Sequence, residues 1–407
     1  MKIANFNKRR IVEHIATEYG AAMITSIDRQ KCTGCGSCVR KCTLDVFSLD
    51  TNQEDLAPCM AGCPCRADIR GVLYLLQQDK QEEALQLLKQ SVPFPALTSR
   101  LCAHACEDSC IRQPEAERVD VCGLERFLGD LDLRTPPPAI RERHVARVAV
   151  IGGGLTGMSC AYFLRVQGYP VALFDEDGSA GGWLKYLEQL GMPHGMLEYC
   201  EGTLRKMGVE FCLPVKVGHG GDVSLGDLFR EGFRAVCIAT GSEEGFRQAF
   251  PEAVLDDGRI LADAGTCQTK ACGVFAAGGC CGASAPETAT AQAHDAALSV
   301  NAYLSGIDMM VQRPVRSMAK VLPPVLPTFA PGISSRVDDW TSVMALEAMQ
   351  RESFRCCTCG SKAFIAHPDD CMTCFTCEMS CPAGAVTVHP FKEILPRSLK
   401  ESWERRS

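Results

Sequence analysis

Two short runs of cysteine, one near each end of the chain, have a spacing that suits metal chemistry. They are KCTGCGSCVRKC, with Cys32, Cys35, Cys38 and Cys42, and CMTCFTCEMSCP, with Cys371, Cys374, Cys377 and Cys381. In this C-x2-C-x2-C-x3-C spacing, three close thiolates bind one 4Fe-4S cubane and the fourth commonly binds a neighbouring cluster. Structural zinc, the alternative metal, prefers two separated C-x2-C pairs. We therefore expect an iron–sulfur segment at each end of the chain.

The fourth cysteine of each run needs a second cluster to bind. The spacing is that of bacterial ferredoxins, so both segments are expected to be ferredoxin-like. The two runs could meet in space and exchange Cys42 and Cys381. Alternatively Cys356, Cys357 and Cys359, which lie just before the second run, could supply its partner. Spacing alone leaves both arrangements open.

A glycine pattern in the middle of the chain predicts a dinucleotide site. Gly152, Gly154 and Gly157 form G-x-G-x-x-G between an expected strand (VAVI) and an expected helix. The first glycine permits the turn, the second lets the backbone approach a pyrophosphate, and the third lets helix and strand pack closely. The intervening Leu155 and Thr156 belong to the same phosphate-binding turn. Asp175 ends the next expected strand, where an acid can bind ribose hydroxyls.

Between these motifs lies a helical stretch that is also rich in cysteine. ADIRGVLYLLQQ and QEEALQLLKQ carry apolar residues at helical spacing. The cysteines here are Cys59, Cys63, Cys65, Cys102, Cys106, Cys110 and Cys122. Together with APCMAGCPC, RLCAHACEDSC and CGLERFLGD, this stretch resembles the N-terminal iron–sulfur domain of the glutamate synthase small subunit and of dihydropyrimidine dehydrogenase.

The resemblance implies a helical domain with one or two 4Fe-4S clusters. One cluster is implied to be bound by Cys63, Cys102, Cys106 and Glu125. The second would include Cys59 and Cys110. The family places two more cysteines shortly before the position of Cys59, where this chain has only TNQEDLAP; the candidates to replace them are Cys65, Cys122 or a member of the N-terminal run.

The number of cysteines limits the number of clusters. The candidate ligands are eleven cysteines up to Cys122, seven cysteines from Cys356 onward, and Glu125. At four ligands each, they suffice for about four cubanes. We expect three or four.

The α/β part of the chain resembles the FAD domain of the same family, so that the resemblance to the family spans most of residues 55–305. The turn SAGGW supplies Gly181, Gly182 and Trp183, the ATG turn supplies Ala239, Thr240 and Gly241, and the returning strand GVFAAGG ends in Gly278 and Gly279. The resemblance implies that these residues bind FAD. Gly279 departs from the family, which has at this position an Asp that contacts the FAD chain.

The family's NAD(P)-binding domain is missing from this chain. In the family it is inserted between the ATG turn and the returning strand, with its own glycine fingerprint. Here only residues 242–272 fill that interval. This is too short for a βαβ unit and its neighbours, because the first βαβ unit alone needs over ~30 residues. No second fingerprint occurs in the sequence. We therefore expect the flavin half without the nicotinamide half.

These features predict a multidomain chain: an α-helical iron–sulfur domain, a Rossmann-like α/β FAD domain and ferredoxin-like segments at both termini. The expected order is an N-terminal ferredoxin-like segment (1–50), the helical iron–sulfur domain (51–140), the FAD-binding domain (141–310), a proline-rich linker (311–343) and a C-terminal ferredoxin-like segment (344–407).

Composition excludes several classes of function. The net charge of -7 argues against nucleic-acid binding, and the longest apolar runs are too short to span a bilayer. The N-terminal residues include no apolar run typical of a signal peptide, so we expect a cytoplasmic protein. Oxygen-sensitive clusters in this number indicate an anaerobic organism.

A flavin and several clusters without a nicotinamide site predict an electron-transfer subunit of a larger oxidoreductase complex. FAD accepts two electrons, whereas clusters carry one at a time. The expected partner is an NAD(P)H module, a ferredoxin, or a molybdenum or tungsten enzyme. Two alternatives stay open: a self-sufficient NAD(P)H-dependent reductase, and a cluster scaffold whose nucleotide site is degenerate.

Overall fold

The computed structural model divides the chain into two compact units, which are treated separately below. It describes residues 24–29, 31–32, 37–44, 46–50, 56–112, 118–218, 220–241, 259–310, 344–356, 359, 361–367, 370–372, 374–381 and 383–388. The first unit comprises the described residues of Met1–Ala57 and Cys357–Ser407, and the second those of Pro58–Ser317 and Phe329–Cys356. The linker expected at 311–343 lies outside the described residues. No helix among those described is long and apolar enough to cross a membrane.

The second unit begins with a group of short helices. They are α3 (Pro58–Gly62), α4 (Ile69–Gln77), α5 (Gln81–Leu88), α6 (Pro95–Leu101), α7 (Ala105–Asp108) and α8 (Val121–Asp132). Side-chain caps start the two longest: Asp68 accepts a hydrogen bond from Gly71 N, and Asp120 accepts one from Gly123 N, both at 2.9 Å. The helical periodicity predicted for α4 and α5 is confirmed.

A helix from the far end of the sequence packs on this group. It is α15 (Leu346–Ser353), which contacts α4 and α8. We expected residues 344–407 to form one segment, but residues up to Cys356 belong to the second unit. The reason is specific hydrogen bonding, such as that from Gln77 Nε2 to Ser353 O at 2.7 Å, which sequence spacing does not reveal.

The rest of the second unit is a parallel five-stranded sheet of order β5-β4-β3-β6-β7. Its strands are β3 (Arg147–Ile151), β4 (Val171–Phe174), β5 (Glu210–Cys212), β6 (Phe233–Ile238) and β7 (Val274–Ala276). Central β3 pairs with β4 and β6, so that Val150 aligns with Leu173 and Cys237. The inner strands are apolar on both faces, as expected for a parallel sheet covered by helices.

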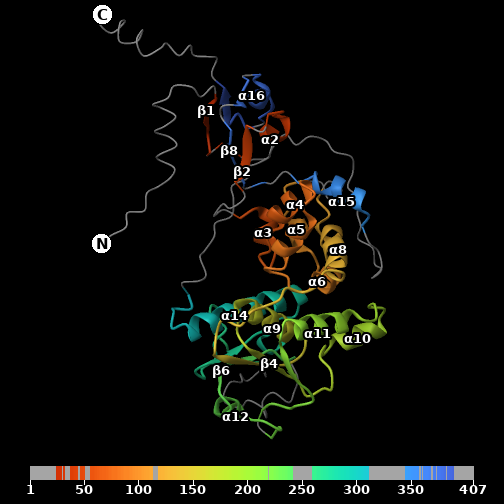
Figure 1. The fold of residues 1–407 in the computed structure, drawn as a ribbon, viewed down its shortest axis with the longest axis vertical. Coiled ribbons are helices and arrows are strands. Elements are labelled where there is room, and N and C mark those ends of the chain that lie inside the picture. Colours follow the sequence, from red (N-terminus) through yellow and green to blue (C-terminus); the bar gives the residue numbers. More distant parts are fainter. Residues whose placement is uncertain are drawn as a thin grey trace, which may run out of the picture. The chain divides into compact units, whose positions relative to one another are not determined.

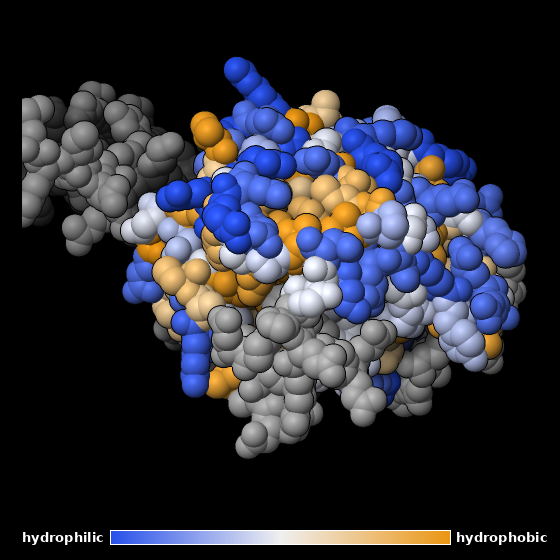
Figure 2. Space-filling model, turned by 90° about the horizontal axis from the view of Figure 1, so that it is seen from below, coloured by the Kyte–Doolittle hydropathy of each residue, from blue (hydrophilic) through white to orange (hydrophobic). Residues whose placement is uncertain are grey.

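Helices cover both faces of this sheet. They are α9 (Leu155–Gln167), α10 (Leu184–Gln189), α11 (Met196–Lys206), α12 (Leu225–Arg230) and α14 (Pro286–Leu304). Figure 1 shows α9, α11 and α14 on one side and α12 on the other, and each side has its own buried apolar cluster. Figure 2, viewed from the α12 side, shows an exposed apolar strip that hydrophilic residues border in part. The expected Rossmann-like α/β architecture is present.

A buried ion pair within the helical group also contacts the α/β part through Tyr199. Lys89, just after α5, lies 2.5 Å from Asp132 Oδ1 at the end of α8, with side chains 10% and 2% exposed. Tyr199 on α11 donates its hydroxyl to the other oxygen of Asp132. Burial and then the negative charge of Asp132 raise the pKa of Tyr199 well above its usual range, so the phenol stays protonated and donates.

Replacing Asp132 with asparagine should lower the free energy of unfolding by about 3 kcal/mol, because it leaves the Lys89 ammonium buried without a counter-charge. Urea unfolding followed by circular dichroism measures this. The control is Glu201→Ala, which removes an exposed pair with Arg205 (2.7 Å) and should change stability by less than about 1 kcal/mol. Equal effects of the two variants would contradict the role given to the buried pair.

The first unit is assembled from both ends of the sequence. Strand β1 (Ile24–Ile27) pairs antiparallel with β9 (Val386–Val388), and β2 (Phe47–Asp50) pairs antiparallel with β8 (Lys362–Ile365). Helix α2 (Ser37–Lys41) contacts α16 (Thr376–Ser380). Red and blue elements therefore lie side by side at this unit in Figure 1.

Candidate functional site

The glycine turn after β3 opens on a cavity of about 660 Å³. Eleven of the predicted cofactor-binding residues line it: Gly152, Gly154, Leu155, Thr156, Asp175, Gly182, Trp183, Ala239, Thr240, Gly241 and Gly279. Most of them come from the carboxyl ends of β3, β4 and β6 and from the start of α9, at the edge where parallel sheets bind ligands. Lys216 and residues 283–286 also line the cavity; they lie after β5 and at the start of α14, and no sequence motif marks them.

Three predicted residues do not line the cavity. They are Gly157, Gly181 and Gly278. A Cβ on Gly157 would lie 1.8 Å from Gly152 O, so this glycine allows α9 to pass close to the turn. Gly181 N donates to Gly153 O at 2.8 Å, and Gly278 N donates to Gln292 Oε1 at 2.7 Å. These glycines shape the loops around the cavity.

The geometry of the turn fits a pyrophosphate. A Cβ on Gly154 would meet nothing within 4 Å, so this residue faces open space. Gly154 is also the N-cap of α9 and offers no side chain to the first-turn N–H groups, which are the usual ligands of a phosphate at a helix N-terminus. The Thr240 hydroxyl, in the lining of the same cavity, is buried and has no hydrogen-bond partner among the described residues.

Asp175 is held by the turn that it borders. Its Oδ2 accepts from Gly153 N at 2.5 Å and its Oδ1 accepts from Asp177 N at 2.9 Å. A carboxylate oxygen has a second lone pair, so both oxygens can still accept from a ribose hydroxyl. Asp175 therefore braces the glycine turn in addition to facing the cavity.

The structure brings together the four cluster ligands implied for the helical domain. The charges of Glu125, Cys63 and Cys102 all act on the thiol of Cys106. Burial, together with these charges, raises the pKa of Cys106 well above its usual range. Burial, reinforced by the Glu125 charge, likewise raises the pKa of Cys102 to about 12. Cys65 joins the same group through a hydrogen bond with Cys63. Crowded buried thiols of this kind are stabilised as thiolates when they bind a metal.

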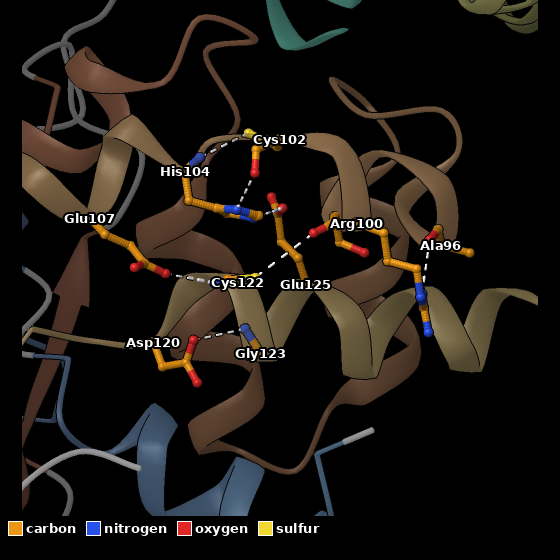
Figure 3. Close-up of polar contacts among 10 residues, drawn as sticks. Ala96, Arg100, Cys102, His104, Glu107, Asp120, Cys122, Gly123 and Glu125 are labelled. Carbon is orange, nitrogen blue, oxygen red and sulfur yellow. Dashed lines mark hydrogen bonds and ion pairs between the residues drawn. The ribbon is translucent and has the colours of Figure 1, made fainter. Parts of the chain in front are cut away.

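A histidine that the sequence analysis did not single out orients Glu125 (Figure 3). His104 Nε2 lies 2.9 Å from Glu125 Oε2, and His104 Nδ1 lies 2.9 Å from Cys102 O. Burial alone would lower the pKa of His104, but hydrogen bonds with Cys122 and Glu125 raise it to about 12. These contacts of the two ring nitrogens fix the orientation of His104, and they leave the other oxygen of Glu125 available to a metal.

Cys59 and Cys110 form a second pair in the helical domain. Burial, with the charge of Cys110 as the next cause, raises the pKa of Cys59 to about 12. Helix α3, which contains Cys59, contacts α7, which ends two residues before Cys110. Cys122, a candidate to complete this pair, instead directs its thiol to Ser99 O at 3.8 Å and lies beside His104.

In the first unit, the cysteine runs from the two ends of the chain meet. Cys42 shares the lining of a small cavity with Cys371, Cys374 and Cys377. This is the juxtaposition expected if the runs exchange their fourth cysteines.

The structure also describes most of the other cysteines of the two runs. Cys32 Sγ accepts from Ala363 N at 3.4 Å and Cys381 Sγ from Ala385 N at 3.3 Å, while Cys38 is buried. Cys35 and Cys357 lie outside the described residues. Cys356 belongs to the second unit and Cys359 to the first. Within the described ranges, no three His, Cys, Asp or Glu side chains converge on a single-ion site.

Comparison with known proteins matches these two parts of the chain to two families. Residues 53–135 match dihydropyrimidine dehydrogenase domain II with its 4Fe-4S cluster, and residues 130–297 match the pyridine nucleotide-disulphide oxidoreductases. The boundary between the matches falls at the junction of the helical group with the α/β part.

Curated relatives match the same region. They include NADPH-Fe(3+) oxidoreductase subunit beta of Geobacter sulfurreducens (29% identical over 192 residues), NADP(+)-dependent formate dehydrogenase subunit beta of Moorella thermoacetica (31% over 210) and NAD-dependent dihydropyrimidine dehydrogenase subunit PreT of Escherichia coli (26% over 194). Each match covers 46% of this chain and 28%, 29% and 46% of the respective relative. Among solved structures, a thioredoxin reductase from Gloeobacter violaceus is 12% identical, with 40% of this chain and 96% of that chain covered and a TM-score of 0.30.

Proposed function

We propose that the chain is an electron-transfer subunit of a multi-subunit oxidoreductase. The premise is that residues 53–297 resemble the family of FAD and iron–sulfur oxidoreductases that includes dihydropyrimidine dehydrogenase and the glutamate synthase small subunit. The chain relays electrons between 4Fe-4S clusters through FAD to a partner subunit. The observation that carries the proposal is that one compact unit contains both the glycine-turn cavity and the buried cysteine group around Glu125.

The proposed flavin site uses the glycine turn, the start of α9 and polar side chains that line the cavity. Gly154 and the first turn of α9 hold the pyrophosphate, Asp175 holds a ribose, and the Thr240 hydroxyl gains its missing partner. When bound, FAD supplies a junction between two-electron and one-electron chemistry. Gly279, where the family has Asp, lines the cavity with its backbone alone, so a backbone amide takes the place of the family's carboxylate.

The proposed clusters number three or four. Cys63, Cys102, Cys106 and Glu125 hold one, and the contact of His104 with Glu125 Oε2 orients the carboxylate. The ferredoxin-like unit holds two, each bound by three cysteines of one run and the last cysteine of the other. Clusters of this type carry single electrons, and their number makes the chain an electron relay.

The proposed partner is another oxidoreductase subunit, such as an NAD(P)H module, a ferredoxin, or a molybdenum or tungsten enzyme. Relatives that are named as subunits of NADPH- and NADP(+)-dependent oxidoreductases support this. The lack of a second glycine fingerprint in the sequence favours delivery of electrons by the partner over direct use of NAD(P)H.

Three measurements on the full chain, purified without oxygen, test the proposal. Acid extraction should release FAD, and iron and sulfide analysis should give about 12 to 16 iron atoms per chain, at four for each cubane. In stopped-flow mixing, NADH and NADPH should leave the flavin oxidised while dithionite bleaches it. Rapid bleaching by either nucleotide would instead identify a self-sufficient reductase. Absence of FAD would leave the scaffold alternative.

Glu125→Ala should remove about four iron atoms per chain, because it deletes the only non-cysteine ligand of its cluster. Glu125→Gln should keep the iron, since the resembled family uses either side chain, and should shift the reduction potential of this cluster. The control is Glu198→Ala on the exposed face of α11, which should change neither quantity. An unchanged iron content in a folded Glu125→Ala variant would remove Glu125 from the ligand set.

A further inference from the structure

Cys65 is a buried thiol, 5% exposed, to which the proposed function gives no role. Its neighbours belong to the Glu125 cluster, which is the cluster proposed for Cys63, Cys102, Cys106 and Glu125. We propose that Cys65 is a positioning residue of this cluster: its thiol donates a hydrogen bond to the Cys63 ligand and so raises the reduction potential of a cluster that lies next to the flavin cavity. The inference rests on the proposed function, since it takes the cluster as bound.

The first observation is the place of the Cys65 thiol within the ligand group. Arg66 N donates to Cys63 O at 2.9 Å, which closes a four-residue turn directly after α3. Within this turn, the sulfurs of Cys63 and Cys65 share a hydrogen bond. The charges of Glu125 and Cys102 also act on the Cys65 thiol. Cys65 therefore lies among the ligands of the Glu125 cluster.

The second observation is that the same thiol contacts the start of α14. Cys65 Sγ lies 3.2 Å from the carbonyl oxygen of Glu287, the second residue of this helix. Pro286, the first residue of the helix, lines the flavin cavity together with Ala285 and Ala289. Cys65 therefore touches the same helix turn that lines the cavity.

The third observation is that α14 has further interactions with the ligand group. Arg66, the residue after Cys65, pairs with both carboxylate oxygens of Asp295, at 2.7 and 2.6 Å. Asp295 lies eight residues after Glu287, a spacing that puts both residues on one face of the helix. The charge of Glu287 also acts on the thiol of Cys102. Helix α14 thus contacts the cluster ligands and forms part of the cavity wall.

The chemistry follows from the single proton of the Cys65 thiol. Its two acceptors are the Cys63 sulfur and Glu287 O, and a charged thiolate forms the stronger hydrogen bond. Hydrogen bonds to the sulfurs help to set the potential of a cluster. They stabilise the reduced cluster more, because it carries one more negative charge. In electron transfer, one cofactor gains the single electron that the other releases, and Cys65 keeps its proton and its bonds.

Cys65→Ala and Cys65→Ser separate hydrogen bonding from packing, because only serine keeps a donor at this position. The full chain, purified without oxygen, is titrated with dithionite and followed by electron paramagnetic resonance, and iron is measured on the same samples. The signal of the Glu125 cluster is the one that Glu125→Ala removes.

Cys65→Ala should shift the ratio of reduced to oxidised cluster about tenfold towards the oxidised form, which is about 59 mV for one electron. Cys65→Ser should restore most of this shift, and both variants should keep their iron. The control is Cys200→Ala, which replaces another buried thiol, on α11, and should change neither quantity.

Loss of about four iron atoms from Cys65→Ala would make Cys65 a ligand and overturn the proposal. An unchanged potential in Cys65→Ala would overturn it too, as would an equal shift in both variants, because packing would then be the cause. An unmodified chain without iron would refute the proposed function and the inference with it, whereas a full iron content with an unchanged potential refutes the inference alone.

Discussion

Gly154→Asp should abolish flavin binding and leave the fold intact. The new side chain starts in open space, since a Cβ at this position meets no atom within 4 Å. Its carboxylate stands at the N-terminus of α9, where the pyrophosphate is expected, so it excludes the ligand by volume and by like charge. We expect affinity for FAD to fall at least a hundredfold, about 2.8 kcal/mol.

The matched control is Gly202→Asp on α11, where a Cβ also meets no atom within 4 Å. It should retain FAD in full. Fluorescence of FAD released by acid gives the occupancy, and circular dichroism with iron analysis shows whether the rest of the chain is folded. A folded Gly154→Asp variant with full FAD would place the cofactor elsewhere.

The local part of this site was predictable because it depends on neighbours in sequence. The order of strand, glycine turn and helix is written in consecutive residues, and β3 and α9 appear where the pattern predicts them. The part of the cavity wall that Lys216 forms could not be predicted from the sequence. Lys216 faces the cavity only because the parallel sheet places the end of β5 beyond that of β4.

The cysteines divide in the same way. Their spacing predicts clusters, but it cannot say which thiol joins which cluster, since that depends on contacts over hundreds of residues. The bond from Arg112 to Arg355 O, which brings Cys356 to the helical domain, leaves no trace in local spacing. His104 was missed for a related reason: a single histidine is usually structural, and only the fold places its ring against Glu125.

Cys42→Ser, near the N-terminus, should cause loss of the cluster that the C-terminal cysteine run binds. Cys42 precedes β2 in sequence, yet it lies with Cys371, Cys374 and Cys377. The variant should lose about four iron atoms per chain, and the loss should come from the cluster that those three cysteines bind. Iron analysis and electron paramagnetic resonance of the reduced protein measure it, with Cys272→Ser as the control.

Pairs of variants distinguish the exchange of ligands from two independent runs. Cys42→Ser combined with Cys374→Ser should lose no more iron than either alone, because both remove one cluster. Cys42→Ser combined with Cys32→Ser should lose about eight iron atoms, because the two residues then serve different clusters. Independent runs require the reverse pattern. Since β1 pairs with β9 and β2 with β8, the exchange would make cluster assembly depend on completion of the whole chain, and both clusters would be acquired only after the C-terminal run has joined the N-terminal one.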